Sequence, residues 1–147
     1  MKTIQLQKMN DMNHAIIQFR GFYSSWAKRH HISYQELLVL YSIRDKGCCS
    51  QRQIAQNYLL PRQTVHHTIS SMREEGTLVL DEALSNGKEK ICVLTKKGHE
   101  KYDHILIELS KLEENVISSL GEKEVEKITK LLKKLDSALI QALKIEK

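Results

Sequence analysis

Residues 60–76 have the sequence Leu-Pro-Arg-Gln-Thr-Val-His-His-Thr-Ile-Ser-Ser-Met-Arg-Glu-Glu-Gly. This segment predicts one complete helix over residues 61–75, because Pro61 suits the first helical turn and Gly76 suits the left-handed residue just past the end. Its apolar side chains recur at helical spacing in one narrow stripe, formed by Val65, Ile69 and Met72. So thin a stripe on so polar a segment indicates a helix that presents its other face to a partner.

The polar face of this helix carries amide, hydroxyl and imidazole groups. At about 100° per residue, the face opposite the stripe contains Gln63, His67 and Ser70, flanked by Thr64 and His66. Such groups can bond base edges in a DNA major groove, which admits one helix. An ordinary solvated surface helix shows the same pattern, so the neighbouring segments decide between the two interpretations.

The composition indicates a mostly helical protein with the length of one domain. The 147 residues include 28% charged residues, 5% aromatics and a single proline, and this length is enough to bury a core. The formal net charge of +5 permits a nucleic-acid partner without requiring one. No apolar run is long enough to cross a membrane, and the N-terminus lacks the apolar core of a signal peptide, so we expect a cytoplasmic protein.

The three cysteines, Cys48, Cys49 and Cys92, are odd in number and lack Cys-x-x-Cys spacing. They therefore predict neither a disulfide framework nor a zinc knuckle, and a reducing compartment suits them. Buried structural thiols and redox-sensing thiols are the two interpretations left open.

Residues 3 to about 30 show the first helical pattern. Its second half gathers four aromatic residues, Phe19, Phe22, Tyr23 and Trp26. These rings belong either to the core or to the wall of a pocket for a small apolar ligand. Gly21 among them would let another backbone or a ligand approach closely. The helix ends at His30 and His31, where a metal-binding pair is a minor alternative because no acidic or thiol neighbour has ligand spacing.

Two capping boxes open the next two helices. Residues 33–36 (Ser-Tyr-Gln-Glu) open a helix that is apolar on nearly every side and stops at Gly47, so we expect it to be the core helix. Residues 50–53 (Ser-Gln-Arg-Gln) open a short helix that ends near residues 59–60. Followed by the helix over 61–75, this short helix predicts a helix-turn-helix.

The hydrophobic period then changes from helical to strand-like. Residues 78–80 and 91–94 are short strand candidates, and Asn86-Gly87 between them favours a tight turn because both residues tolerate positive φ. We interpret residues 81–90 as the tip of a β-hairpin wing that contacts phosphates or the minor groove. The cations of this tip are Lys88 and Lys90. A solvated hairpin is the alternative, supported by the nearby acids Asp81, Glu82 and Glu89.

Two long helices are expected at the C-terminal end. Thr95 can cap the first, from residue 96 to about 120, and Gly121 separates it from the second, from 122 to about 145. The apolar stripe of the first helix consists of Tyr102, Ile105, Leu109, Leu112 and Val116. The heptad stripe of the second consists of Val125, Ile128, Leu132, Leu135, Leu139 and Ala142. One small winged domain cannot cover these stripes, so we expect pairing with a second copy about a two-fold axis.

The predicted fold is therefore mainly α with a small β-hairpin wing. We expect one domain over residues 1–147, in which 33–102 form a winged helix-turn-helix lobe and 1–32 with 103–147 form a helical dimerisation region. The sequence opposes an enzyme, because it has no His-Glu-x-x-His, no Gly-rich phosphate loop and no nucleophile elbow. A protein-interaction module made only of helices would share the heptads but would have no use for a wing.

This order of elements resembles the multiple antibiotic resistance regulator (MarR) family of bacterial transcription factors. The resemblance is sharpest at residues 60–65, in the spacing from there to residues 72–76, and at residues 94–98 (Leu-Thr-Lys-Lys-Gly) after the wing. It implies a triangular homodimer, most simply a repressor, whose two lobes contact successive major grooves of a pseudo-palindromic operator in double-stranded DNA. The residues that it places near bases are Gln63, Thr64 and His67, and those near phosphates are Arg62 and His66. Ser70, Lys88 and Lys90 complete the predicted DNA-binding set.

The wing departs from the family pattern. The family usually has Asp-x-Arg there, with the Arg in the minor groove and the Asp holding it, whereas Asn86, Gly87 and Lys88 stand at the matching positions. Lysine keeps the charge but lacks the planar fork of arginine. We therefore expect a weaker and less sequence-selective wing contact.

The resemblance also implies a ligand. Members of the family commonly release DNA when a small, often phenolic molecule enters a crevice between the dimer helices and the DNA-binding lobe. The residues suited to such a crevice are Phe22, Tyr23, Trp26, His30, Tyr34 and Tyr41. No cofactor is expected. Some members sense oxidants through an N-terminal cysteine or zinc through His and acidic clusters, and a metal- or thiol-redox-sensing regulator of the same fold is the alternative, although neither pattern is matched.

Overall fold

The computed structural model of this protein describes residues 3–145. Its chain divides into two units, one extending to Leu106 and the other beginning at Ile107. The predicted division into a DNA-binding lobe and a dimerisation region stays a prediction. Among the described residues, no helix combines the length and the apolar character needed to span a lipid bilayer.

The first two helices begin and end where the sequence supplies caps. α1 (Ile4–Arg29) begins after Thr3, whose hydroxyl accepts from the Leu6 amide at 3.3 Å, and it ends just before His31 in the left-handed region. α2 (Tyr34–Lys46) has the complete capping box predicted at Ser33 and Glu36, with bonds of 3.0 and 2.7 Å. The helix ends at Gly47, which adopts φ 73°.

The core of the first unit is built around α2, as predicted. Leu37, Val39, Leu40 and Ile43 of this helix are all buried. The α1 rings behave differently, because Phe19 is 62% exposed and Phe22 is 52% exposed. The core interpretation is therefore wrong for these two rings within a single chain. A Cβ at Gly21 would meet nothing within 4 Å, so no described part of the chain makes the expected close approach there.

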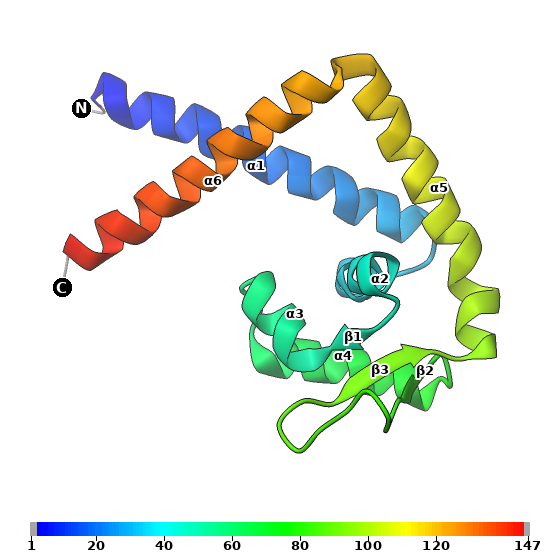
Figure 1. Cartoon of the computed structure of the whole chain (residues 1–147). Helices are drawn as coiled ribbons and strands as arrows, with labels where there is room; N and C mark the ends of the chain where they lie inside the picture. Colours follow the sequence, from blue (N-terminus) through cyan, green and yellow to red (C-terminus); the bar gives the residue numbers. More distant parts are fainter. Residues whose placement is uncertain (1–2, 146–147) are drawn as a thin grey trace. The chain divides into compact units, whose positions relative to one another are not determined.

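The helix-turn-helix is formed by α3 (Gln51–Asn57) and α4 (Arg62–Glu74) (Figure 1). α3 ends at Asn57, earlier than predicted, because the chain turns with Leu59 at φ 51°. Its capping box is half formed: the Gln53 amide donates to Ser50 Oγ at 3.3 Å, while the Gln53 side chain accepts from Lys46 Nζ at 3.5 Å. The side chain of a glutamine at the third helical position can thus bond a residue outside the capping box.

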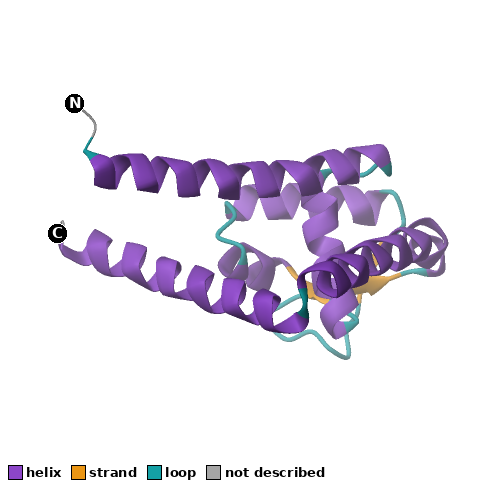
Figure 2. Ribbon diagram, turned by 90° about the horizontal axis from the view of Figure 1, so that it is seen from above, coloured by secondary structure: helices purple, strands orange, loops and turns teal. Residues whose placement is uncertain are grey.

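Three short antiparallel strands form one small sheet (Figure 2). The two predicted strands are present as β2 (Leu78–Leu80) and β3 (Ile91–Leu94), paired with Val79 opposite Val93. The third, β1 (Cys49–Ser50), was not predicted, because two residues are too few to show a period. It pairs with the other edge of β3, so the strand order is β1-β3-β2.

The turn of the hairpin differs from the prediction. Neither Asn86 nor Gly87 has a positive φ, so the expected tight turn is wrong. Instead, Asn86 Oδ1 accepts from the amides of Lys88 and Glu89, both at 2.9 Å. The segment 81–90 is too long for a two-residue connection, and the asparagine side chain therefore closes the turn.

The C-terminal helices are α5 (Lys96–Leu120) and α6 (Glu122–Ile145), separated by Gly121 at φ 93°. The predicted cap of α5 is confirmed, because Thr95 Oγ1 accepts from the Gly98 amide at 3.0 Å. Buried residues of the α5 stripe are Tyr102, Ile105 and Leu109. In contrast, no described residue of α6 is buried, although its apolar side chains follow the predicted heptads.

Candidate nucleic-acid interface

α4 is fixed by one face and presents the other. Its predicted apolar stripe is confirmed, because Val65, Ile69 and Met72 are all buried. On the opposite side, Gln63 and His67 are exposed. The packing of the stripe therefore holds α4 in place without using the polar side chains that the sequence analysis proposed for base contacts.

His66 is held between the two helices of the helix-turn-helix. Its Nδ1 lies 3.3 Å from Gln51 Oε1 on α3, and its Nε2 lies 3.5 Å from Ser70 Oγ one turn along α4. Both contacts are exposed to solvent. His66 is thus oriented at the surface of α4, next to the side chains predicted to face bases.

A basic concavity of about 290 Å³ joins the wing to both helices of the helix-turn-helix. Its lining residues are Gln51, Arg52, Arg62, Gly87, Lys88, Glu89 and Lys90. Three of the predicted DNA-binding cations, Arg62, Lys88 and Lys90, are therefore brought together from α4 and the wing. Cationic side chains that converge in this way can bind phosphate groups.

Arg52 was missed by the sequence analysis. It lies in the first turn of α3, two residues after the Ser50 cap, and it lines the basic concavity together with Arg62. The available signal was a cation in the first turn of the helix that precedes the candidate recognition helix. That signal is weak, because nothing local shows that the first turn of α3 faces the wing.

The acids of the hairpin are used within the protein. Glu89 Oε1 accepts from Ser50 Oγ at 2.7 Å, which links the wing to the cap of α3. Asp81 Oδ1 accepts from the Leu84 amide at 3.0 Å. Two of the three acids that supported a solvated hairpin thus have structural hydrogen bonds, and the lysines remain exposed.

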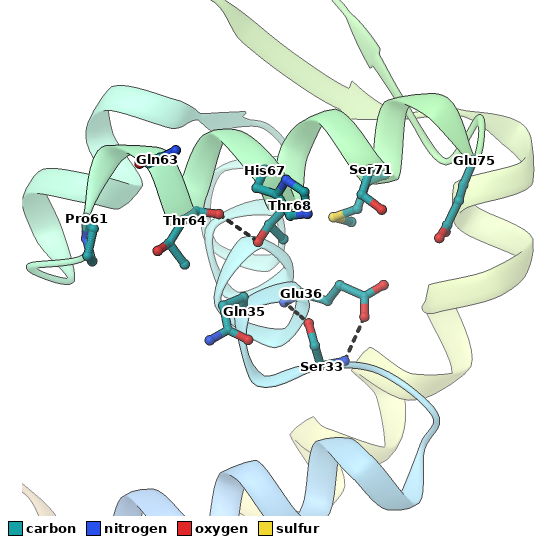
Figure 3. Close-up of a pocket in the computed structure, with 11 residues that line it drawn as sticks. Ser33, Gln35, Glu36, Pro61, Gln63, Thr64, His67, Thr68, Ser71 and Glu75 are labelled. Carbon is teal, nitrogen blue, oxygen red and sulfur yellow. Dashed lines mark hydrogen bonds between the residues drawn. The ribbon is translucent and has the colours of Figure 1, made fainter.

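A second, larger cavity of about 730 Å³ lies between the start of α2 and α4. Figure 3 shows Ser33, Gln35 and Glu36 at the start of α2, below α4 in this view. The α4 side is lined by Pro61, Gln63, Thr64, His67, Thr68, Ser71, Met72 and the adjoining Glu75. Glu36 also accepts from the Tyr102 hydroxyl at 3.1 Å, and burial raises the pKa of Tyr102, which keeps this donor protonated.

The six predicted ligand residues line neither of these two cavities. Phe22 and Tyr41 both lie beside Tyr23, with ring centroids 5.8 and 6.3 Å away. Separately, the Trp26 and His30 rings are 4.0 Å apart. Tyr34 instead lies under the Arg20 guanidinium at 5.9 Å. Their role as a ligand site stays a prediction.

No site for a metal ion is formed by three or more His, Cys, Asp or Glu side chains within residues 3–145. One pair of such side chains is exposed on α5, where His99 Nδ1 lies 2.9 Å from Asp103 Oδ1.

No protein-family model matches the sequence. Two relatives are both known as uncharacterized HTH-type transcriptional regulators. A Staphylococcus aureus protein is 20% identical over 116 residues, which cover 78% of this chain and 80% of that protein. YwoH of Bacillus subtilis is 28% identical over 95 residues, which cover 65% and 69% of the two chains.

Solved structures show the same arrangement of elements. NMB1585, a MarR family regulator from Neisseria meningitidis, superposes with a TM-score of 0.86 at 18% identity, covering 95% of this chain and 99% of that one. The chain has the MarR fold. Reduced AbfR bound to DNA has a TM-score of 0.69 at 19% identity and the same coverage. NadR in complex with 4-hydroxyphenylacetate has a TM-score of 0.65 at 15% identity, covering 92% of this chain and 93% of that one.

The predicted fold class, mainly α with a small wing, is thus confirmed as the MarR fold. The wing of this chain has Asn86 where the family pattern has an aspartate. Asn86 uses its side-chain oxygen on the backbone amides of Lys88 and Glu89. Asn86 therefore shapes the loop that carries Lys88, rather than bonding a cationic head group.

Proposed function

We propose that this protein is a transcriptional regulator that binds double-stranded DNA as a homodimer. In this proposal α4 enters the major groove of each half of a pseudo-palindromic operator, and the wing contacts the sugar-phosphate backbone beside it. Two kinds of similarity support it. The relatives from Staphylococcus aureus and Bacillus subtilis are described as HTH-type transcriptional regulators, and AbfR has been solved on DNA with this fold.

The observation that carries the proposal is that α4 has one buried apolar face and one exposed polar face. One face is buried through Val65, Ile69 and Met72, so the backbone position is fixed by the core. The opposite face leaves Gln63 and His67 in solvent, and the N-terminal end adjoins the cations of the wing. Base-contacting side chains beside phosphate-contacting ones are what readout of a duplex requires.

A second copy of the chain is part of the proposal because both units expose large apolar side chains. On α1 these include Ile17, Phe19 and Phe22. On α6 they include Leu131, Leu132, Leu139, Ile140 and Leu143. Exposed apolar surface of this extent marks an interaction site, and a closed two-fold dimer is the simplest way to cover it.

We further propose that a small aromatic or phenolic acid lowers the DNA affinity, which makes the protein a repressor that the ligand releases. NadR was solved with 4-hydroxyphenylacetate and a Staphylococcus aureus MarR with salicylate and kanamycin, on this same fold. The cavity beside α4 adjoins Gln63 and His67, and the aromatic cluster around Tyr23 is the predicted alternative. Either position acts only if the ligand prefers the conformation that does not fit DNA.

Substitution of the exposed α4 side chains tests the proposal directly. Gln63→Ala and His67→Ala should each weaken binding to the specific site by about 1–3 kcal/mol and relax the preference at one base step. The measurement is fluorescence anisotropy with DNA from upstream of the protein's own coding region, compared with single-base variants of that DNA.

The matched control is His104→Ala, because His104 is also an exposed histidine but lies on α5. This variant should bind DNA like the unaltered protein. Unchanged affinity and unchanged base preference in both α4 variants would contradict the placement of α4 in the groove.

A further inference from the structure

Two cysteines far apart in the sequence are directly opposite each other in the sheet. Cys49 of β1 is the register partner of Cys92 of β3 in an antiparallel pair. Opposite residues in such a pair have Cα atoms about 4.5–5.5 Å apart. That separation lies inside the range of about 4.4–6.8 Å that a disulfide needs. Both cysteines are free thiols in this structure, and their pairing allows a disulfide between them.

The two thiols are chemically unequal. The Cys49 thiol on the paired strand, aided by the charge of Arg73 and opposed by burial, lowers the pKa of Cys92 to about 7. The neighbouring Cys92 thiol and burial raise the pKa of Cys49, which therefore keeps its proton. Cys92 is thus suited to react first as a thiolate, and Cys49 lies in contact as a thiol that can resolve the product.

We propose that Cys49 and Cys92 are a redox pair that forms a reversible cross-strand disulfide when the protein meets a small hydroperoxide such as hydrogen peroxide. The Cys92 thiolate attacks one peroxide oxygen, the O–O bond breaks, and the released hydroxide takes up a proton as water. Cys92 is thereby oxidised to a sulfenic acid and the peroxide is reduced. The Cys49 sulfur then attacks the Cys92 sulfur, the S–O bond breaks, and hydroxide leaves with the Cys49 proton as a second water.

Access to the pair depends on β1. Cys49 is 1% exposed and Cys92 is 4% exposed, so an oxidant reaches them only when the sheet opens locally. β1 has two residues and lies at the edge of the sheet, where it is hydrogen-bonded to a single neighbouring strand, β3. So short an edge strand opens at a low cost in free energy, and a molecule of the size of hydrogen peroxide can then enter. Bulky thiol reagents should react more slowly than peroxide.

The disulfide would also act on the basic concavity, and this part rests on the proposed DNA-binding function. Ser50 follows Cys49, caps α3 and donates to Glu89 at the base of the wing. A disulfide brings two sulfurs to about 2.0 Å, closer than two thiols in contact. Closing the pair therefore moves β3 relative to β1 and shifts the wing lysines against Arg52 and Arg62. The expected consequence is weaker DNA binding, restored by reduction.

The experiment uses the full-length Cys48→Ser variant, because trypsin releases Cys48 and Cys49 in one peptide, residues 47–52, and Cys92 in another, residues 91–96. The variant is treated with hydrogen peroxide, its remaining thiols are blocked with N-ethylmaleimide, and the digest is weighed by mass spectrometry. We expect the two peptides joined with the loss of two hydrogens, and separated again by dithiothreitol. Two blocked thiols, or sulfinic acid at Cys92 without the joined peptide, would overturn the proposal.

DNA binding by the same samples provides the second readout. The oxidised Cys48→Ser protein should lose affinity and regain it with dithiothreitol, whereas peroxide should leave binding by the Cys48→Ser, Cys92→Ser double variant unchanged. A joined peptide with unaltered DNA affinity would overturn the coupling to the wing. Reduced protein that binds no specific DNA would count against the proposed function, while the mass spectrum would still decide the disulfide.

Discussion

At the scale of single residues, Gly98 shows how the absence of a Cβ permits a tertiary contact. It lies in the first turn of α5, where a Cβ would overlap the Thr77 carbonyl oxygen and approach Leu94 Cδ2 to 3.0 Å. Thr77 itself is buried, its hydroxyl donates to the Met72 carbonyl at 2.9 Å, and its carbonyl accepts from the Thr95 amide at 3.0 Å. The absence of a Cβ at Gly98 therefore lets the start of α5 pack directly against the backbone of Thr77, which is itself bonded to the end of α4.

Gly98→Ala should lower the free energy of unfolding by about 1–3 kcal/mol, because the backbone of Thr77 has to move away from the new methyl group. Urea denaturation followed by circular dichroism measures the change. The control is Gly21→Ala, since Gly21 has open space around it within the chain and alanine favours a helix by roughly 0.5–1 kcal/mol. Equal effects of the two substitutions would contradict a close contact at Gly98.

Most residue-level expectations with a local cause were confirmed, although the Gln53 side chain bonds Lys46 instead of completing its capping box. Ser33 with Glu36 and Gly47 behaved as predicted, because a cap needs only the helix end beside it. Asn86 and Gly87 did not, since their backbone depends on how many residues the hairpin must connect. Arg52 could not be assigned from sequence, because its significance comes from Arg62 and the wing that surround it.

At the scale of elements, the wing combines short strands with a loop that bonds to itself and to α3. The pairing of β2 with β3 sets its register. Glu89 connects the loop to α3 by accepting a hydrogen bond from Ser50, the N-cap of that helix. Lys88 is exposed on this loop beside the concavity that contains Arg62. The wing therefore places positive charge next to α4.

Lys88→Ala should weaken binding to specific and random DNA alike and reduce the slope of log affinity against log salt by about one unit, because one phosphate contact is lost. Titrations at several salt concentrations measure this slope. Lys111→Ala is the charge-matched control, since Lys111 is exposed on α5. An unaltered slope for Lys88→Ala, or the same decrease in both variants, would mean that the wing does not contact phosphate.

At the scale of the whole molecule, the prominent feature is apolar surface that a single chain leaves in water. Leu132 is 48% exposed and Leu139 is 53% exposed on α6, and Phe19 and Phe22 are exposed on α1. A heptad stripe with no buried residue gains little stability from the chain that carries it. The second copy that we propose would bury this stripe.

Leu132→Asp should shift the protein from dimer to monomer, because it places a charge in an apolar interface. Analytical ultracentrifugation over a range of protein concentrations measures the equilibrium. Ser137→Asp is the matched control, since Ser137 is exposed on the other side of α6 and its hydroxyl bonds only the Lys133 carbonyl within its own helix. A monomeric unaltered protein, or equal dissociation of both variants, would contradict the proposed dimer.

Sequence alone determined where most helices begin and end and which faces are apolar. Caps, glycines and hydrophobic periods act over a few residues, so they are visible without knowing the rest of the chain. The α4 helix is the clearest instance, because its stripe, its polar face and its boundaries were all predicted before its neighbours were known.

Only the tertiary structure decided which distant residues meet. Strand β1 exists because β3 pairs with it, and that pairing sets Cys49 against Cys92 across 42 intervening residues. The same arrangement brings Ser50 to Glu89 and collects the cations of α3, α4 and the wing in one concavity. Such contacts depend on how the whole sheet and its helices pack, and no local pattern in the chain encodes them.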